Sequence, residues 1–298
     1  HGRQEVTLTG VARACGVTTP ACYKHFPSKP SLFNAAVRQL SSNLGEQAEQ
    51  QLQDDPVESL LAIGMILINL AADHPHLFEF NQLSPEAVAA LDAGYHVLVE
   101  KPFALHPRQA EEMIAAARRN DRFLMEGWLT AFEPGARAVR RALPDLLADG
   151  PGPHRALLVK EQFSSRMAAY RAGGLPPAFD PAAGGGSLMD LGVYPVSMAV
   201  HLFGEPARVR ATGRLLASGA DSHGVVVLDY ETLPDGRATD LEVVCLHSKT
   251  SRGAAPSSIA SDNLALSMDD VQWPRRIALT GPQGEQDLSV EMRTSFLE

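Results

Sequence analysis

The sequence has 298 residues, of which 45% are hydrophobic and 20% are charged, and its formal net charge is −9. A chain of this length and composition holds about two globular domains and is neither disordered nor fibrous. Its longest apolar stretch, residues 60–70, is too short to span a bilayer, so we expect no membrane segment.

The first residues and the cysteines bear on where the protein works. The chain begins at His1 without a basic-then-apolar leader, so we expect no secretory signal and interpret the chain as a fragment or trimmed product. Three scattered cysteines fit neither a disulfide framework nor a zinc site. We therefore expect free thiols, no metal and a cytoplasmic location.

Basic residues are concentrated at the N-terminus. Residues 1–40 contain five Lys or Arg and one acidic residue, whereas residues 41–100 contain no Lys or Arg. The overall acidity argues against a chain that binds nucleic acid throughout. The basic segment is therefore expected to have a role of its own.

Residues 7–26 predict two short helices around a tight turn. Thr7 is placed to cap the first helix, and Gly16 to supply a positive φ at the break. Thr18 or Thr19 is placed to cap the second helix, and a third helix is predicted to start two residues after this segment. The pattern is that of a helix-turn-helix followed by a supporting helix.

The segment TLTGVARACGVTTPACYKHFPSKPSLFNAAV, residues 7–37, resembles the DNA-binding segment of the tetracycline-repressor (TetR) family. The resemblance implies contact with operator DNA through these residues. A short second helix with small N-terminal residues can enter a major groove while its neighbours bind phosphates. The residues implied to face the groove are Thr18, Thr19 and Lys24, and those implied to hold the backbone are Tyr23, His25 and Lys29. The alternative is a small helical hairpin with Tyr23 and Phe26 in its core.

Residues 44–80 are predicted to form further helices, which range from amphipathic to fully apolar. They complete an all-α N-terminal part, residues 1–82.

After this part the pattern becomes α/β. It predicts a helix ended by Gly94, a strand in YHVLVE, a helix from Pro107 and a strand in RFLMEG. This order predicts a partial Rossmann-like domain over residues 83–150.

Residues 151–298 predict an α+β domain with a largely antiparallel sheet. Its strands are expected in RALLVKEQF, GVVVLDY, LEVVCL and RIALTG, with Gly- and Pro-rich loops between them. The predicted fold class is therefore mixed: an all-α helix-turn-helix part, a partial Rossmann-like α/β part and an α+β domain.

Three segments carry a second resemblance: ALDAGYHVLVEKPFAL, RFLMEG and GGGSLMDLGVYPVSMAVHLFGEP. Over residues 84–298 the chain resembles the glucose-fructose oxidoreductase and inositol dehydrogenase (Gfo/Idh/MocA) family. Within that family it is most similar to the dihydrodiol and xylose dehydrogenases. The resemblance implies an NAD(P)-dependent oxidoreductase that acts on a sugar, polyol or dihydrodiol. It also implies a homo-oligomer.

Oxidation of a carbinol needs a base for the hydroxyl proton, a cation near the developing alkoxide, and a nicotinamide. The resemblance assigns cofactor contacts to Glu100, Lys101 and Pro102, and catalysis to Lys101, Asp190 and Tyr194. Asp190 and Tyr194 are four residues apart, which places them on one face of a helix. Tyr194 is implied to transfer the proton, with its phenol acidified by Lys101, while Asp190 orients the substrate hydroxyl or the lysine. The alternative is a helix-start carboxylate and a core aromatic.

Two features depart from the family pattern. No Gly-x-Gly-x-x-Gly turn occurs anywhere in the chain, and Ala131 stands where an Arg is expected. Trp128 is a candidate to flank the substrate, although packing alone also accounts for it. Because the turn that cradles the phosphates is absent, we expect this chain to bind NAD(P) weakly or not at all.

Three alternatives stay open. The chain is a transcriptional regulator with a dehydrogenase-like sensor or dimerisation domain, or a non-catalytic homo-oligomeric scaffold, or a chimeric or misassembled product joined near residue 82 with neither activity.

Overall fold

The computed structural model describes residues 7–27, 32, 84–150 and 154–291. Lys29, the predicted third helix start and the helices predicted over residues 44–80 lie outside the described residues. The chain forms two compact units. The first runs to Val99 and includes Pro107–Met125, and the second comprises Glu100–His106 and the residues from Glu126 onward.

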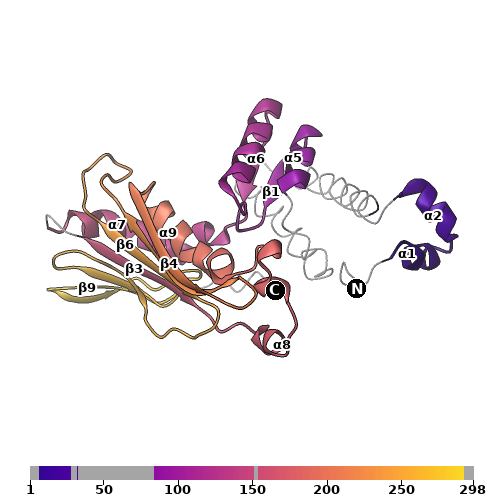
Figure 1. Cartoon of the computed structure of the whole chain (residues 1–298). Coiled ribbons are helices and arrows are strands. Elements are labelled where there is room, and N and C mark those ends of the chain that lie inside the picture. The colour runs from indigo at the N-terminus through magenta and orange to yellow at the C-terminus, as the bar shows by residue number, and fades with distance from the viewer. Residues whose placement is uncertain (1–6, 28–31, 33–83, 151–153, 292–298) are drawn as a thin grey trace. The chain divides into compact units, whose positions relative to one another are not determined.

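The helix-turn-helix of the first unit forms as predicted (Figure 1). Its helices are α1 (Leu8–Ala14) and α2 (Thr19–His25). The hydroxyl oxygen of Thr7 accepts a hydrogen bond from the Gly10 amide at 3.0 Å, and Gly16 at the turn has φ 69°. Of the two candidate caps of the second helix, the structure selects Thr18, whose hydroxyl oxygen accepts from the Ala21 amide at 3.4 Å.

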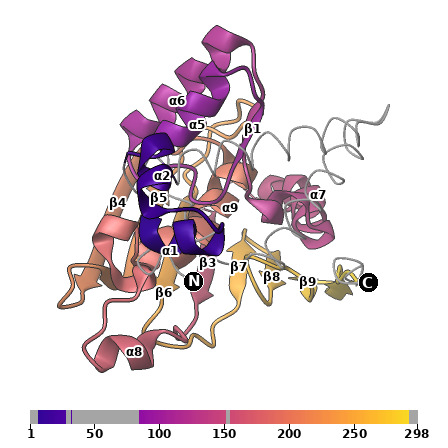
Figure 2. The same cartoon turned by 90° about the vertical axis from the view of Figure 1, so that its right-hand side faces the viewer.

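The strand-helix-strand order is also confirmed. The elements are α5 (Ser84–Asp92), β1 (Val97–Val99), α6 (Pro107–Asn120) and β2 (Leu124–Glu126). The strands β1 and β2 are neighbours in a two-stranded sheet. Figure 2 shows α5 and α6 side by side, and Leu91, Ala116 and Ala117 bury the contact between them.

The second unit is built on an eight-stranded sheet with the order β10-β9-β8-β7-β3-β6-β5-β4. Its strands are β3 (Arg155–Glu161), β4 (Arg208–Leu215), β5 (Asp221–Asp229), β6 (Glu242–Ser248), β7 (Ser257–Ala260), β8 (Ala265–Met268), β9 (Ile277–Gly281) and β10 (Gly284–Asp287). Only β3 and β6 pair in parallel, and all other neighbours pair antiparallel. The predicted largely antiparallel sheet is therefore confirmed.

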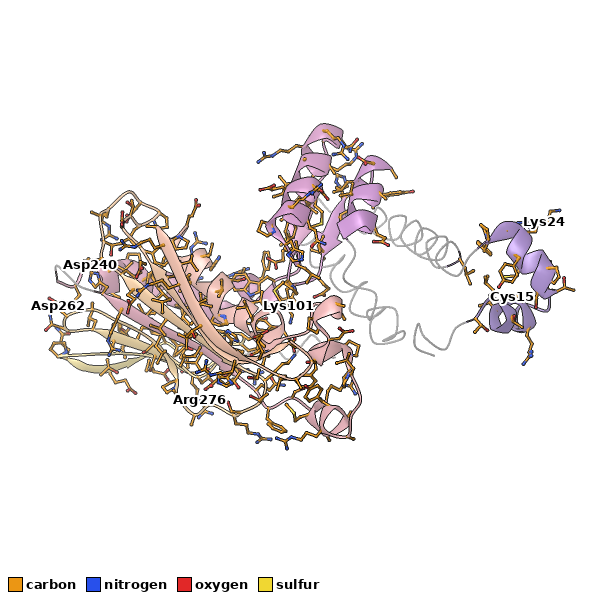
Figure 3. All side chains as sticks on the ribbon, in the orientation of Figure 1. Cys15, Lys24, Lys101, Asp240, Asp262 and Arg276 are labelled. Atoms are coloured by element: carbon orange, nitrogen blue, oxygen red, sulfur yellow. The ribbon has the colours of Figure 1, made fainter. Side chains whose placement is uncertain are left out.

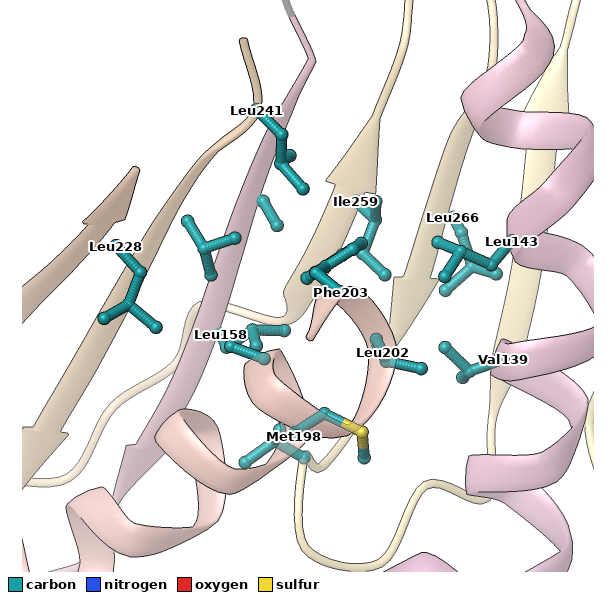
Figure 4. Close-up of a cluster of buried hydrophobic side chains, with 14 of the residues drawn as sticks. Val139, Leu143, Leu158, Met198, Leu202, Phe203, Leu228, Leu241, Ile259 and Leu266 are labelled. Carbon is teal, nitrogen blue, oxygen red and sulfur yellow. The ribbon is translucent and has the colours of Figure 1, made fainter. Parts of the chain in front are cut away.

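Two helices of this unit, α7 (Pro134–Ala148) and α9 (Val193–Phe203), pack on the sheet. Figure 4 shows side chains of both helices facing the strands, among them Leu143 from α7 and Met198 and Leu202 from α9. The unit also contains a short helix, α8 (Met167–Arg171), and short 3-10 turns at Leu129–Phe132, Pro177–Phe179 and Pro181–Ala183.

The start of α9 differs from the regular helix that we expected. A π-helical turn, η5 (Leu188–Gly192), precedes it, so Asp190 lies in the π turn and Tyr194 in the α-helix. Two local contacts accompany this turn. The Asp221 carboxylate accepts a hydrogen bond from the Leu188 amide at 2.7 Å, and Gly192 packs closely against His247. Turns of this kind are frequent at functional sites.

None of the described helices has the length and apolar character needed to cross a bilayer.

Candidate active site

Three predicted catalytic residues, Lys101, Asp190 and Tyr194, lie together in the second unit. Lys101 follows the end of β1 by two residues, and the Lys101–Pro102 peptide bond is cis. The ammonium nitrogen of Lys101 donates to the main-chain carbonyl of Asp190 at 3.0 Å and lies 3.5 Å from Oδ1 of the same residue. It also lies 4.8 Å from the centroid of the Tyr194 ring. Residues far apart in the sequence thus form one cluster. Lys101, one of its members, is labelled in Figure 3.

A second lysine, Lys249, contacts the same carboxylate. It follows β6 directly and is only 1% exposed. Its ammonium nitrogen lies 3.0 Å from Oδ2 of Asp190 and donates to the main-chain carbonyls of Ala178 at 2.7 Å and Gly186 at 3.1 Å. Sequence reasoning missed this residue. Its signal is a single lysine directly after a strand of mostly apolar residues.

A third lysine, Lys160 on β3, faces the Tyr194 ring with its ammonium nitrogen 5.7 Å from the ring centroid. Asp270 binds this ammonium through both carboxylate oxygens, at 3.0 and 2.8 Å. The Tyr194 ring therefore lies near two ammonium groups, and the Lys160 ammonium is already paired. Sequence reasoning missed Lys160 as well.

Electrostatics at Tyr194 differ from the prediction. Burial raises the pKa of the Tyr194 phenol above its ordinary value, and the positive charge and hydrogen bonding of Lys101 oppose this without reversing it. The charges of Asp190 and Glu100 add to the rise in this pKa. Lys101 therefore lowers this pKa in the direction that we expected, but desolvation outweighs the ammonium and the pKa ends above its ordinary value.

The loop after β1 carries the predicted cofactor contacts Glu100, Lys101 and Pro102. A side chain of the next strand holds this loop, since the Glu126 carboxylate accepts a hydrogen bond from the Phe103 amide at 2.8 Å. Burial raises the pKa of Glu126. The loop thus has a fixed anchor beside Lys101.

The glycine loop before η5 needs residues without a side chain. A Cβ on Gly185 would collide with the carbonyl oxygen of Pro177 and lie 2.7 Å from the Asp180 amide nitrogen. Below the loop, Nδ1 of buried His247 lies 2.9 Å from the Ser187 hydroxyl. The Asp221 carboxylate lies 3.7 Å from the same ring nitrogen, so these three residues do not form a relay through both imidazole nitrogens.

Trp128 and Ala131 belong to the main hydrophobic core of the second unit. Trp128 is 8% exposed and meets the His201 ring edge-on at a centroid distance of 5.5 Å. Ala131 packs against the same core. Packing therefore accounts for Trp128.

The predicted DNA contacts lie on the first unit. Thr18, Tyr23, Lys24 and His25 are exposed, and Thr19 is half-buried. Figure 3 labels Lys24 on α2. Tyr23 is 50% exposed, which argues against the alternative that places it in a helical core, whereas Phe26 does pack against buried Leu8, Ala12 and Cys22.

All three cysteines are free, with Cys15 exposed and Cys22 and Cys245 buried. Among the described residues, no group of His, Cys, Asp and Glu side chains is arranged to bind a metal ion.

A strand-helix-strand unit is the building block of nucleotide-binding α/β folds, and in this chain a sheet domain with a clustered lysine, carboxylate and tyrosine follows it in the sequence. Residues 62–128 match the oxidoreductase family with an NAD-binding Rossmann fold, and residues 161–250 match the GFO/IDH/MocA C-terminal domain. The chain belongs to the GFO/IDH/MocA oxidoreductase family. Residues 1–36 match the tetR family of bacterial regulatory proteins.

Several curated proteins are similar to this chain. The scyllo-inositol 2-dehydrogenase (NADP(+)) IolU of Bacillus subtilis is 39% identical over 65% of this chain and 56% of its own length. The uncharacterized oxidoreductase YgjR of Escherichia coli is 34% identical over 81% of this chain and 70% of its own length. The trans-1,2-dihydrobenzene-1,2-diol dehydrogenase of Danio rerio is 30% identical over 61% of this chain and 48% of its own length. The matched region thus spans only about half of the first and third of these relatives.

A solved structure shares the fold. The NAD-binding oxidoreductase from Klebsiella pneumoniae superposes with a TM-score of 0.56 and 22% identity, over 70% of this chain and 57% of that one. The family match begins at residue 62, inside the part that we assigned from sequence to the N-terminal helical segment.

The residues present fit the cofactor in part. Lys101 lies just past the carboxyl end of β1, which is where open α/β sheets bind ligands. The glycine fingerprint that cradles the phosphates is absent from the 298 residues. Lys101 thus lies where such sheets bind ligands, and the usual phosphate turn is not among the 298 residues.

Proposed function

We propose that the chain is an oxidoreductase that interconverts an alcohol and a carbonyl on a sugar, polyol or dihydrodiol. The observation that carries this proposal is the convergence of Lys101, Asp190 and Tyr194 in one cluster. The relatives support the substrate class, because their names specify scyllo-inositol and trans-1,2-dihydrobenzene-1,2-diol. NAD(P), when bound, supplies the hydride chemistry.

Tyr194 is the group that moves the proton. The phenol is protonated at neutral pH, as an ordinary tyrosine is, and its raised pKa keeps it so, which leaves its proton available for a carbonyl oxygen. The phenol O–H bond breaks, the proton forms the alcohol O–H, and the negative charge stays on the tyrosine oxygen. The Lys101 ammonium stabilises that charge. The reverse reaction needs the phenolate, so it is favoured as the pH rises.

Asp190 orients the cluster. Its main-chain carbonyl holds the Lys101 ammonium, and its half-exposed carboxylate is accessible to a substrate hydroxyl. In this role the carboxylate accepts a hydrogen bond from the sugar or diol and does not take its proton.

We propose that NAD(P) binding by this chain is weak, because no Gly-x-Gly-x-x-Gly turn is present. A fluorescence titration with NADPH and NADH tests this point. We expect no saturation at micromolar cofactor, and a micromolar dissociation constant would contradict the proposal.

Activity is tested by following cofactor reduction at millimolar NADP+ or NAD+ with a panel of inositols, aldoses and trans-diols. We expect slow turnover that increases with pH, with at least one polyhydroxy compound. No turnover with any member of the panel would contradict the proposed function.

A second candidate function is operator binding by the N-terminal helices. The match of residues 1–36 to the tetR family and the exposed Tyr23, Lys24 and His25 favour it. In this alternative the remainder of the chain serves as a sensor or dimerisation domain. A gel shift on palindromic DNA tests it, with a salt-dependent complex that Lys24→Ala weakens as the supporting result.

We also propose a homo-oligomer in the cytoplasm. β4 is exposed along its whole length, with Val209 61% and Leu215 72% exposed, and the free cysteines are typical of a reducing compartment. Light scattering after size-exclusion chromatography tests the oligomeric state, and a monomer would contradict it.

A further inference from the structure

Lys249 is paired with groups of the protein itself. Two of its three N–H donors bond to the carbonyls of Ala178 and Gly186, and its ammonium forms an ion pair with the Asp190 carboxylate at 3.0 Å. At 1% exposure the side chain is also out of reach of a ligand. A charge buried this deeply is costly unless it is fully paired, so any role of Lys249 in the reaction must act through its partners.

The partner that matters is the Asp190 carboxylate, which has a lysine on each oxygen. Oδ2 lies 3.0 Å from the Lys249 ammonium, and Oδ1 lies 3.5 Å from the Lys101 ammonium. The shorter contact is to the buried lysine, and the longer one is to the lysine beside Tyr194. With a side chain that is 47% exposed, the carboxylate would be free to turn toward Lys101 if Lys249 were absent.

Such a turn would compete with Tyr194 for Lys101. One N–H of Lys101 already bonds to the Asp190 carbonyl at 3.0 Å. Lys101 also donates to Oδ1 of Asp190, at the longer distance of 3.5 Å. A shorter contact would strengthen this ion pair and offset more of the charge that faces the Tyr194 ring. The present geometry keeps the contact long.

We propose that Lys249 is a positioning residue that draws the Asp190 carboxylate toward itself and keeps the contact between that carboxylate and Lys101 long, so that more of the Lys101 charge acts on Tyr194 and a substrate oxygen. The effect of Lys249 on catalysis rests on the proposed function. Its effect on the position of the Asp190 carboxylate does not, so each effect is tested by its own measurement.

The first readout is the titration of Tyr194, followed by NMR of tyrosines labelled with carbon-13 at Cζ. The charged groups that face this ring are Lys101, Lys160, Asp190 and Glu100. Lys249→Met is expected to raise the pKa of Tyr194 by about 0.5 or more, because the released carboxylate pairs with Lys101. In the Asp190→Asn background the same substitution is expected to have no such effect.

This comparison separates positioning from a direct effect of charge. A direct loss of the Lys249 charge would raise the pKa of Tyr194 equally in both backgrounds, and that result, or no change in either, would overturn the proposal. Leu266→Ala on β8 is the control, since it removes a fully buried side chain without changing a charge. Lys249→Gln keeps donors for the two carbonyls and replaces the Met variant if that variant fails to fold.

The second readout is kinetic. Lys249→Met is expected to lower kcat with little change in the KM of the polyol, and to add little to the loss caused by Asp190→Asn. Equal losses in the two backgrounds would overturn the positioning role. If the wild-type chain turns over no polyol, the proposed function fails, while the titration still decides whether Lys249 positions Asp190.

Discussion

The ammonium nitrogen of Lys101 lies 4.8 Å from the centroid of the Tyr194 ring, and it is the main influence that opposes the effect of burial on that phenol. Burial disfavours the phenolate, and the cation favours it. The balance leaves the pKa of Tyr194 above its ordinary value, so the side chain keeps its proton to a higher pH than an ordinary tyrosine does. Two consequences can be measured directly.

The first prediction concerns the titration of Tyr194. Its phenolate is expected to form only above the range of an exposed tyrosine, and Lys101→Met is expected to raise the pKa further because the opposing cation is removed. Carbon-13 NMR of labelled tyrosines follows the transition, with exposed Tyr23 as the internal comparison. A phenolate at neutral pH, or an unchanged transition in the variant, would contradict the account of this site.

The second prediction concerns stability in acid. Burial lowers the pKa of His247 below its ordinary value, so the folded state favours the neutral ring. The neutral ring therefore contributes to the free energy of unfolding above the ordinary histidine pKa. This contribution is lost as the pH falls toward and through the lowered pKa of the folded state, because the unfolded chain binds the proton first. Urea unfolding at pH 7.5 and pH 5 is expected to show this loss.

His247→Gln is expected to reduce the difference in unfolding free energy between the two pH values, because the variant has no imidazole to protonate. His25→Gln, at an exposed position of α2, is the control and should leave the difference unchanged. The same pH dependence in wild type and in His247→Gln would show that other groups cause it.

The third prediction concerns the glycine loop. Gly185→Ala is expected to destabilise the second unit by about 1–3 kcal/mol, because the new methyl group meets the Pro177 carbonyl and the Asp180 amide. Gly174→Ala is the control with less crowding, since the nearest atom to its added Cβ would be the Ala169 carbonyl oxygen at 3.1 Å, and it should destabilise the protein less. Chemical unfolding compares the two. Equal stability of both variants would mean that the loop tolerates a side chain at Gly185.

Local signals made much of the first unit predictable from sequence. Thr7 and Gly16 act within a few residues of their own positions, so their residue types alone indicate a cap and a turn. Six strands were predictable in the same way, from short runs of β-branched and apolar residues, whereas the short or polar strands β4, β7, β8 and β10 were not named from sequence. The π-helical turn at Leu188–Gly192 was not, and its contacts with His247 and Asp221 join residues far apart in the sequence, which local patterns do not reveal.

The site was predictable only in part. Lys101, Asp190 and Tyr194 came from a family resemblance, and the structure does bring them together. Lys249 and Lys160 approach this cluster only through the pairing of β6 and β3, which sequence spacing does not reveal. The sign of the pKa shift at Tyr194 also depends on burial, which is a property of the folded chain.

The most direct test of the account compares wild type with Tyr194→Phe in cofactor reduction at millimolar NADP+ and NAD+, with inositols and trans-diols as substrates. We expect slow turnover in wild type and a loss of about 10²-fold or more in the variant, whose ring keeps the packing but cannot carry the proton. Unfolding free energies of the two proteins should stay close, since only a hydroxyl is removed. Equal turnover in wild type and Tyr194→Phe, or none in wild type with any substrate, would contradict the account.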